Sequence, residues 1–302
     1  GSAEFDESGK GAQIMSEVSA VQPRRSLIFT PGNRPDMFPK ALRTGADIIT
    51  VDLEDAIAPQ HKDEAREKTL ALFADMPETG GVECVVRINT IRSADGLKDL
   101  SAIIAADTPP DAIMLPKVKS AEEIQLIDEL LIDSCAHIRL HVIIETNDGL
   151  HRCYDIAKSS ARIDSLLFGA VDMAAELRVE PVWEPLFRAR SQLVHAAAGA
   201  GLDLIDVPFL DLEDMSGLKE EAERCAALGF TGKGAIHPKQ IATLNEAFSP
   251  SEAQIDYARR VIKAFEEGDS GLVLIDNKLI EKPVLRSMYR ILAVADAARG
   301  RN

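Results

Sequence analysis

The segments LHVIIE (residues 140–145) and LLFGAVD (residues 166–172) decide the predicted fold, because each is an apolar run that ends in an acid. Runs of this length are typical of strands that are buried on both faces, as in a parallel sheet. An acid directly after such a strand lies at the carboxyl edge of the sheet, where α/β folds place their chemistry. Glu145 and Asp172 are therefore the first candidates for a functional site.

Two carboxylates on adjacent strands would jointly hold one hard divalent cation and leave coordination positions for an oxygen-rich substrate. A small number of oxygen ligands suits Mg²⁺, with Mn²⁺ as an alternative. No His is near both Glu145 and Asp172 in the sequence, which argues against zinc. A second interpretation is that the two acids cap the helices that follow, because acids are favoured at helix N-termini.

The same alternation of an apolar run with a helical stretch continues in both directions along the chain. Strands are predicted at 25–30, 47–53, 83–89, 111–118, 202–209 and 232–237, besides the two runs that end at Glu145 and Asp172. Strands that alternate with helices indicate βαβ units and a parallel sheet. Eight such units predict an α/β fold of the (β/α)₈ TIM barrel type. A doubly wound sheet is the alternative, but no GxGxxG follows the first strand.

Three regions are expected along the chain. They are a cloning remnant with a flexible N-terminus at 1–24, the TIM barrel at 25–250, and a C-terminal helical and hairpin extension at 251–302. Within the extension, helices are predicted at 252–267 and 284–298, with an irregular or hairpin segment at 271–281 between them. We expect this extension to cover an active site, that of a neighbouring subunit or its own, unless it serves only for packing.

The composition excludes several classes of partner. A net charge of −15, from 49 acids against 34 bases, argues against a nucleic-acid-binding surface and against binding to anionic membranes. The four cysteines are far apart and form no CxxC pair, which indicates the reducing cytoplasm rather than a disulfide framework. No apolar stretch approaches the length needed to span a membrane.

Polar residues are concentrated at the predicted strand ends: Thr30, Asp52, Glu54, Asp55, Arg87, Asn89, Lys117, Glu145, Asp172, Asp206 and His237. Arg87 lies inside the apolar strand VVRIN, where a guanidinium needs an acidic partner or an anionic ligand. Glu54, after the neighbouring strand, is the expected partner. Arg87 is either half of a structural ion pair or a cation directed at a carboxylate or a developing enolate oxygen. For His237 a buried role or a role in stabilising a turn is favoured over catalysis.

Two short backbone segments are further candidates for ligand binding. Gly169, Ala170 and Val171 have small side chains just before Asp172, so their peptide N–H groups can approach a substrate closely. The loop of Pro31, Gly32, Asn33 and Arg34 follows the first strand, and Arg34 is available to a phosphate. The alternative for this loop is an ordinary turn between a strand and a helix.

Taken together, these residues closely resemble the citrate lyase β-subunit-like family, which is grouped with malyl-CoA and citramalyl-CoA lyases and the HpcH/HpaI aldolases. The resemblance covers about residues 25–298. It is carried by RSLIFTPGNRPDM (25–37), GADIITVDLEDAIAP (45–59), VRINT (86–90), LPKV (115–118), IIET (143–146), FGAVDMAAEL (168–177), IDVPF (205–209) and GFTGKGAIHPKQI (229–241).

The resemblance implies a (β/α)₈ barrel, Mg²⁺, CoA thioester substrates and assembly into trimers or hexamers. It implies that Glu145 and Asp172 are the metal ligands, that Arg87 binds substrate with support from Glu54, and that the loop from Pro31 to Arg34 lies near CoA. In the family, the last acid of a DGKMID-like motif acts as a base in an adjacent subunit. Here that motif reads DNKLIE and ends in Glu281. The metal motif, GAED in many relatives, reads GAVD, with Val171 in place of an acid.

The resulting expectation is a cytoplasmic, homo-oligomeric and Mg²⁺-dependent acyl-CoA lyase. It would cleave a malyl-, citramalyl- or citryl-CoA type substrate into acetyl-CoA and a 2-oxo acid. Glu281 and Arg87 would be its catalytic residues. Three alternatives stay open: a malyl-CoA-type thioesterase, a CoA-independent aldolase acting on 2-oxo acids, and a non-catalytic or complex-dependent citrate lyase β-like subunit.

Overall fold

The computed structural model describes residues 22–132, 135–268 and 271–299. By its contacts the chain forms two compact units, one of residues 24–248 and one that contains residues 249–302. Most of the predicted N-terminal remnant, residues 1–21, lies outside the described residues. No helix in the described part of the chain combines the length and the apolar character that a membrane span requires.

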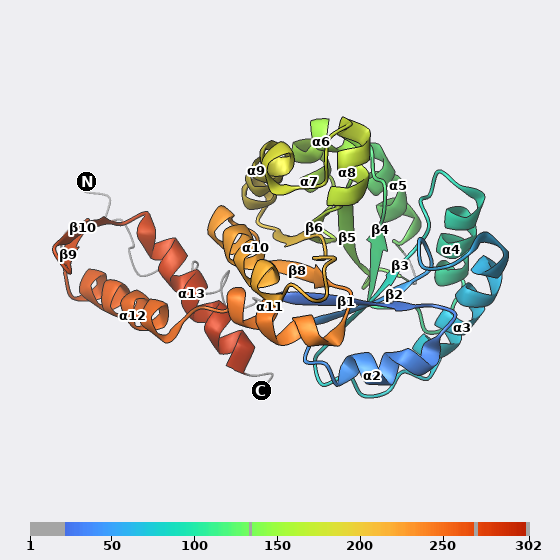
Figure 1. The fold of residues 1–302 in the computed structure, drawn as a ribbon, viewed down its shortest axis with the longest axis horizontal. Coiled ribbons are helices and arrows are strands. Elements are labelled where there is room, and N and C mark those ends of the chain that lie inside the picture. The colour runs from blue at the N-terminus through green and yellow to red at the C-terminus, as the bar shows by residue number, and fades with distance from the viewer. Residues whose placement is uncertain (1–21, 133–134, 269–270, 300–302) are drawn as a thin grey trace, which may run out of the picture. The chain divides into compact units, whose positions relative to one another are not determined.

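The first unit is a closed parallel barrel in which each strand pairs with the next and β8 pairs with β1 (Figure 1). Its strands are β1 (Ser26–Pro31), β2 (Ile48–Asp52), β3 (Glu83–Arg87), β4 (Ala112–Leu115), β5 (Arg139–Ile144), β6 (Ile163–Phe168), β7 (Asp203–Asp206) and β8 (Gly232–Ala235). The predicted (β/α)₈ TIM barrel is confirmed.

Helices surround the barrel on the outside (Figure 1). They are α2 (Phe38–Leu42), α3 (Lys62–Ala74), α4 (Ala94–Ile104), α5 (Ala121–Leu130), α6 (Asn147–His151), α7 (Cys153–Ala157), α8 (Ala170–Leu177), α9 (Trp183–Ala200), α10 (Met215–Leu228) and α11 (Ile241–Ala247). Short 3₁₀ turns add Pro35–Met37, Pro59–His61 and Pro238–Gln240. His237 accepts a hydrogen bond from the Lys239 backbone N–H at the start of the last of these, in agreement with the predicted turn role.

The prediction that the sixth strand ends at Asp172 is wrong. β6 ends at Phe168, and α8 begins only two residues later, at Ala170. Asp172 therefore lies in the first turn of α8 rather than at the end of a strand. An apolar run does not reveal by itself where a buried strand changes into a buried helix, because both are apolar.

The barrel has two apolar layers because alternate residues of each strand point to opposite faces. The larger layer fills the space between strands and helices, with members such as Ile113, Val142 and Leu166. The smaller layer fills the inside of the barrel and consists of Leu27, Ile48, Val85, Ala112, Met114, Ile143, Leu167 and Ile205, with Phe29 packed against it.

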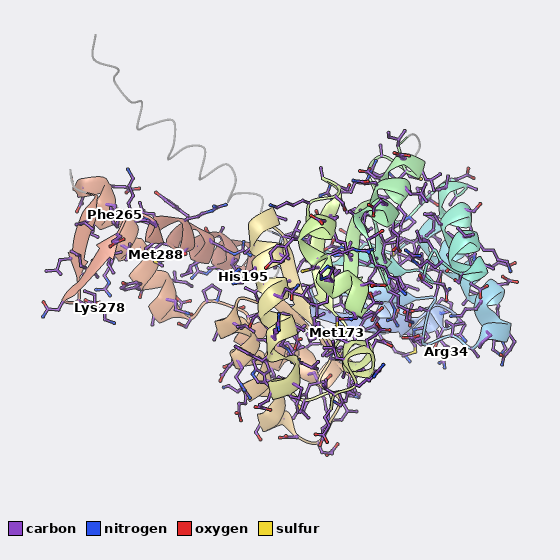
Figure 2. The ribbon with its side chains drawn as sticks, turned by 90° about the horizontal axis from the view of Figure 1, so that it is seen from above. Arg34, Met173, His195, Phe265, Lys278 and Met288 are labelled. Atoms are coloured by element: carbon purple, nitrogen blue, oxygen red, sulfur yellow. The ribbon has the colours of Figure 1, made fainter. Side chains whose placement is uncertain are left out.

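The second unit contains α12 (Glu252–Glu267), the antiparallel hairpin of β9 (Leu272–Ile275) and β10 (Lys278–Glu281), and α13 (Val284–Arg299). Asp276 and Asn277 both have positive φ, as a two-residue type I′ hairpin turn requires. One hairpin face packs into an apolar cluster with Met288 and Phe265 of the helices (Figure 2). The other face is exposed and carries Leu272, Leu274, Leu279 and Glu281.

A cluster of charged residues lies at the amino ends of the barrel strands. The guanidinium of Arg24 donates to Glu83 at 2.7 Å, to Asp164 at 2.9 Å and to Asp203 at 2.9 Å, and so connects β3, β6 and β7. Burial alone would raise the pKa of Glu83, but His141 and Arg24 outweigh it and lower that pKa to about 2. The arginine thus holds together three strands that are distant in sequence.

We predict that Arg24→Met destabilises the protein by about 3 kcal/mol, because it leaves buried acids without their shared cation. Urea unfolding at pH 7 measures this loss. Arg34→Met, which removes an exposed arginine whose ion pair is with the equally exposed Asp36, should give no measurable change. Because the pKa of Glu83 is depressed, its stabilising contribution is present above about pH 4.5 and is lost as the pH falls toward 2. Equal stability of the two variants would contradict this role of Arg24.

Candidate active site

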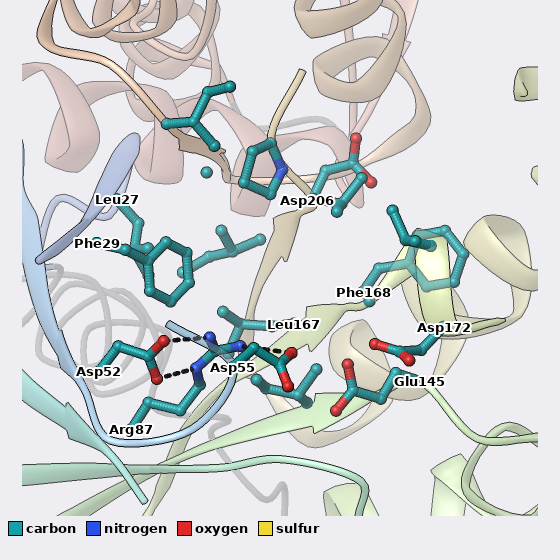
Figure 3. A pocket seen from close by; sticks show the side chains of 18 of the residues that line it. Leu27, Phe29, Asp52, Asp55, Arg87, Glu145, Leu167, Phe168, Asp172 and Asp206 are labelled. Carbon is teal, nitrogen blue, oxygen red and sulfur yellow. Dashed lines mark hydrogen bonds and ion pairs between the residues drawn. The ribbon is translucent and has the colours of Figure 1, made fainter. Parts of the chain in front are cut away.

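A cavity of about 470 Å³ opens at the carboxyl ends of the barrel strands (Figure 3). Its inner part is apolar and its rim carries acids and one arginine. The described residues that line it are Leu27, Phe29, Asp52, Asp55, Ala56, Arg87, Ile143, Glu145, Leu167, Phe168, Gly169, Val171, Asp172, Ile205, Asp206, Val207, Pro208, Leu210, Gly234 and Ile236. The predicted site residues Arg87, Glu145, Gly169, Val171 and Asp172 therefore meet in one cavity.

Glu145 and Asp172 lie side by side in this cavity, with their carboxylates facing one another (Figure 3). Glu145 follows β5 directly, and its Oε1 accepts the backbone N–H of Lys117 at 2.8 Å. Lys117 adopts a left-handed conformation (φ 55°) that presents this N–H to the carboxylate. Gly169 is required beside it, because a Cβ at that position would collide with the Glu145 side chain.

These carboxylates have a deficit of compensating positive charge. Burial, followed by repulsion from Glu54 and Asp172, raises the pKa of Glu145 to about 8. Among the described residues, no group of three or more His, Cys, Asp or Glu is arranged to hold a metal ion. Two carboxylates alone suit Mg²⁺, which keeps several water or substrate oxygens in its coordination shell. The donor set and its excess negative charge thus fit a magnesium ion held by Glu145 and Asp172.

Arg87 is fixed by the neighbouring strand. Its Nε and Nη2 donate to the two carboxylate oxygens of Asp52 at 2.7 and 2.6 Å, a bidentate ion pair. Its Nη1 lies 3.2 Å from Oε2 of Glu54, and its guanidinium lies 4.9 Å from the centre of the Phe29 ring. Asp52 thus occupies one edge of the Arg87 guanidinium, and Arg87 also lines the cavity (Figure 3).

Asp52 is the partner that the sequence analysis did not identify; only Glu54 was predicted. β2 and β3 are parallel and in register, with Asp52 directly opposite Arg87. Both residues are the last of their strands, and this was the available signal. Asp52 also accepts the backbone N–H groups of Glu54 and Ala56, so one carboxylate orders both the arginine and the loop after β2.

Glu54 is shared between two cations. Its Oε1 accepts a hydrogen bond from Lys117 Nζ at 2.5 Å, and its Oε2 faces Arg87 without the alignment of a hydrogen bond. Burial raises the pKa of Glu54, although the charges of Arg87 and Lys117 oppose the shift. Lys117, which the sequence analysis noted only as a strand-end residue, thereby links Glu54 to the carboxylate of Glu145.

The start of α8 presents backbone N–H groups beside the cavity. Gly169 is the N-cap and has no side chain with which to cap the helix. The first N–H groups of any α-helix lack partners within the helix and favour an anion. Ala170 is buried, whereas Val171 is 52 % exposed and lines the cavity. Gly169 and Val171 line the cavity and Ala170 does not, and substrate binding by the N–H groups of this segment stays a prediction.

The loop from Pro31 to Arg34 is not among the described residues that line the cavity. Gly32 is needed there for packing, because a Cβ would meet the Thr69 hydroxyl at 2.6 Å and Leu53 Cδ2 at 2.8 Å. Arg34 is exposed and forms a bidentate ion pair with Asp36. The described contacts of this loop are those of an ordinary strand-to-helix turn, and a role in CoA binding stays a prediction.

Glu281 belongs to the second unit. It is the last residue of β10, opposite Leu272, and its side chain is exposed. The structure therefore brings Arg87, Glu54, Glu145 and Asp172 together in the barrel. It describes Glu281 as a carboxylate on the exposed face of the hairpin.

A (β/α)₈ barrel whose polar side chains gather at the carboxyl ends of its strands has the arrangement of an enzyme. Comparison with known proteins agrees. The profile of the HpcH/HpaI aldolase/citrate lyase family matches residues 25–238. The citrate lyase subunit beta of Leuconostoc mesenteroides subsp. cremoris is 32% identical over 286 residues, which cover 91% of this chain and 94% of that protein.

Two further relatives extend the comparison. The mitochondrial citramalyl-CoA lyase of Homo sapiens is 30% identical over 296 residues, covering 92% of this chain and 87% of that protein. The crystal structure of CitE from Mycobacterium tuberculosis, in complex with magnesium, acetoacetate and coenzyme A, has a TM-score of 0.75 at 30% identity and covers 92% of this chain and 99% of that one. The chain belongs to the HpcH/HpaI aldolase/citrate lyase family, and the prediction of a carbon–carbon lyase is confirmed.

We predict that the protein binds Mg²⁺ more tightly as the pH rises from 6 to 8 and shows little change above 8. Below its raised pKa of about 8, Glu145 is mostly neutral and must lose its proton before it can bind a cation. Calorimetric titration at pH 7, in buffers of different ionisation enthalpy, should report the release of about one proton per ion. Glu145→Gln should bind Mg²⁺ weakly and without proton release. A pH-independent affinity in the unaltered protein would contradict the assignment.

Proposed function

We propose that the protein is a Mg²⁺-dependent acyl-CoA lyase that cleaves a 3-hydroxyacyl-CoA of the malyl-, citramalyl- or citryl-CoA type. The observation that carries this proposal is the pair of neighbouring carboxylates Glu145, whose pKa is raised, and Asp172, in the barrel cavity that Arg87 also lines. The relatives support it, since one is named a citramalyl-CoA lyase and another was crystallised with magnesium and coenzyme A.

The proposed reaction is a retro-Claisen cleavage. A base removes the proton of the 3-hydroxyl group, the carbonyl of the 2-oxo acid forms, and the bond between carbons 2 and 3 breaks. The electron pair of that bond passes to the thioester as an enolate, and a proton returned to carbon 2 completes acetyl-CoA. No oxidant or reductant is needed, because the electrons and atoms of the substrate account for both products.

Bound magnesium would supply positive charge to the oxygens of the 2-oxo acid. Residues of the protein would supply the other groups that stabilise the reacting substrate. Arg87, fixed by Asp52, would counter the negative charge that develops on substrate oxygen, together with the N–H groups at Ala170 and Val171. Because Asp52 holds the guanidinium in advance, little reorganisation would be needed when charge develops.

We assign the base to Glu281, acting on the cavity of a neighbouring subunit. The exposed hairpin face around Glu281 carries Leu272, Leu274 and Leu279, which are 45%, 67% and 63% exposed. Leucines so exposed on one face suggest a surface that is covered in an assembly. A carboxylate surrounded by them would lose water on docking and become a stronger proton acceptor. This supports a homo-oligomer, for which we propose a trimer or hexamer.

For CoA we propose contact with the loop from Pro31 to Arg34. Arg34 is an exposed cation on a protein whose net charge is negative. Phosphate oxygens would replace Asp36 as the partners of Arg34. We also propose a cytoplasmic location. The four cysteines are all buried and none is paired in a disulfide among the described residues, which fits a reducing compartment.

A product assay tests the function. With Mg²⁺ present, malyl-CoA, citramalyl-CoA and citryl-CoA are supplied separately, and acetyl-CoA, free CoA and the 2-oxo acid are each measured. We expect acetyl-CoA and a 2-oxo acid in equal amounts from at least one substrate. Free CoA with an intact hydroxy acid would instead establish a thioesterase. No product from any of the three would favour a CoA-independent aldolase or a complex-dependent subunit.

We predict that Glu281→Gln lowers kcat at least about 100-fold and leaves Mg²⁺ and CoA binding unchanged, because only the proton acceptor is lost. Glu145→Ala should lose Mg²⁺ binding as well as activity. If Glu281 acts across subunits, co-expression of the two inactive variants should restore activity, since random assortment leaves about a quarter of the sites with both residues intact. Wild-type activity in Glu281→Gln would place the base elsewhere, and failure of co-expression to restore activity would place Glu281 in its own chain's site.

A further inference from the structure

The floor of the cavity is an apolar layer directly beneath the acids. On β5, Ile143 precedes Glu145 by two residues and therefore points to the same side of the strand. Ile143 is paired in register with Leu167 on β6, and Leu167 is paired with Ile205 on β7. All three line the cavity and belong to the inner barrel cluster. A ligand whose oxygens met the two acids would rest its remaining atoms on this layer.

The wall on the β6 to β8 side is also apolar. Val171, Leu210 and Ile236, from the segments that follow β6, β7 and β8, line the cavity and are 52%, 61% and 46% exposed. Pro208 packs against Gly234 on the same side, where a Cβ at position 234 would meet its ring at 2.8 Å. On this side the charged lining residues are the acids Asp172, in α8, and Asp206, at the end of β7, and the single lining cation among the described residues lies on β3.

Positive charge inside the cavity is scarce and already paired. Among the described lining residues, Arg87 is the single cation, and Asp52 holds it bidentately. Lys117, nearby, is held by Glu54 at 2.5 Å and lies 3.6 Å from Asp55. The cations around Asp206, which are Lys233 and Arg190, lie in the buried layer between sheet and helices and are engaged with that acid.

From this distribution we infer that the acid half of the substrate is a 2-oxo monocarboxylic acid with a small apolar substituent, and that dicarboxylic 2-oxo acids are selected against. This inference rests on the proposed function, which it makes more specific. One carboxylate can be compensated by Arg87 and by the cation that Glu145 and Asp172 would hold. A second carboxylate would be placed against Ile143, Leu167 and Ile205, where it loses water and gains no partner.

The test compares two acids that differ only in the second carboxylate: 2-oxobutyrate, and freshly dissolved oxaloacetate, which has the same number of carbons. Calorimetric titration of the full-length protein in Mg²⁺ gives both dissociation constants, and condensation with acetyl-CoA gives both kcat/KM values. We expect 2-oxobutyrate to exceed oxaloacetate at least about 100-fold in affinity and in kcat/KM. Binding with this preference but without turnover would support the inference and overturn only the lyase function. Equal or tighter binding of oxaloacetate, or binding of neither acid, would overturn the inference.

A matched pair of variants tests the floor itself. Leu167→Ala should shift the preference from pyruvate toward 2-oxobutyrate about 10-fold, because it opens space beneath the acids. Leu166→Ala is the control, since Leu166 is equally buried on the same strand but packs toward the helices. It should reduce stability without changing the preference. If Leu167→Ala does not fold, Leu167→Val removes less volume and should shift the preference in the same direction. An unchanged preference in a folded Leu167 variant would overturn the assignment of the floor.

Discussion

Each barrel strand has to bury both of its faces, and this constraint determines where the protein can keep charge. One face meets the helices and the other meets the opposite strands, so the interior positions are occupied by residues such as Ile113 and Met114, which are fully buried. Charged side chains are then concentrated at the strand ends and in a few compensated positions between sheet and helices. The cavity exists because the inner apolar layer ends at Ile143, Leu167 and Ile205, one layer below the carboxyl ends of the strands.

Most buried charges in the barrel are compensated within hydrogen-bond distance. Arg24 is surrounded by three acids at the amino ends of the strands, and Lys233 has Asp206 at 2.6 Å and Glu221 at 2.7 Å. Arg87 likewise has Asp52. Glu145 differs, because its nearest charged neighbours include two other acids and its pKa is raised to about 8. Burying a carboxylate without a compensating cation lowers the stability of the fold. A carboxylate of this kind at the mouth of a cavity therefore indicates a functional site rather than a structural role.

Features that follow from the periodicity of apolar residues could be predicted from the sequence, whereas features that depend on the register between neighbouring strands could not. Eight apolar runs were sufficient to predict the barrel. The two acids that follow two of these runs were sufficient to predict the centre of the candidate site. The role of Asp52 was missed because an ion pair across strands depends on which residues lie opposite each other, and a single strand does not contain that information. The end of β6 was misplaced because Gly169-Ala170-Val171 is apolar in either a strand or a helix. The left-handed backbone of Lys117, which directs its N–H to Glu145, has no signal in residue type.

The distribution of charge also bears on where a proton acceptor can come from. Within the cavity, Asp52 is committed to Arg87, and Asp206 to Lys233. Glu145 and Asp172 would be neutralised by the cation that they hold. Asp55 remains, but it lies 3.6 Å from Lys117 and 4.0 Å from Arg87, so both cations engage its charge. When the carboxylates of the cavity bind the metal ion or pair with cations, they are poor candidates for the general base of the reaction. This agrees with the proposal that the base is Glu281, on the exposed face of the β9–β10 hairpin.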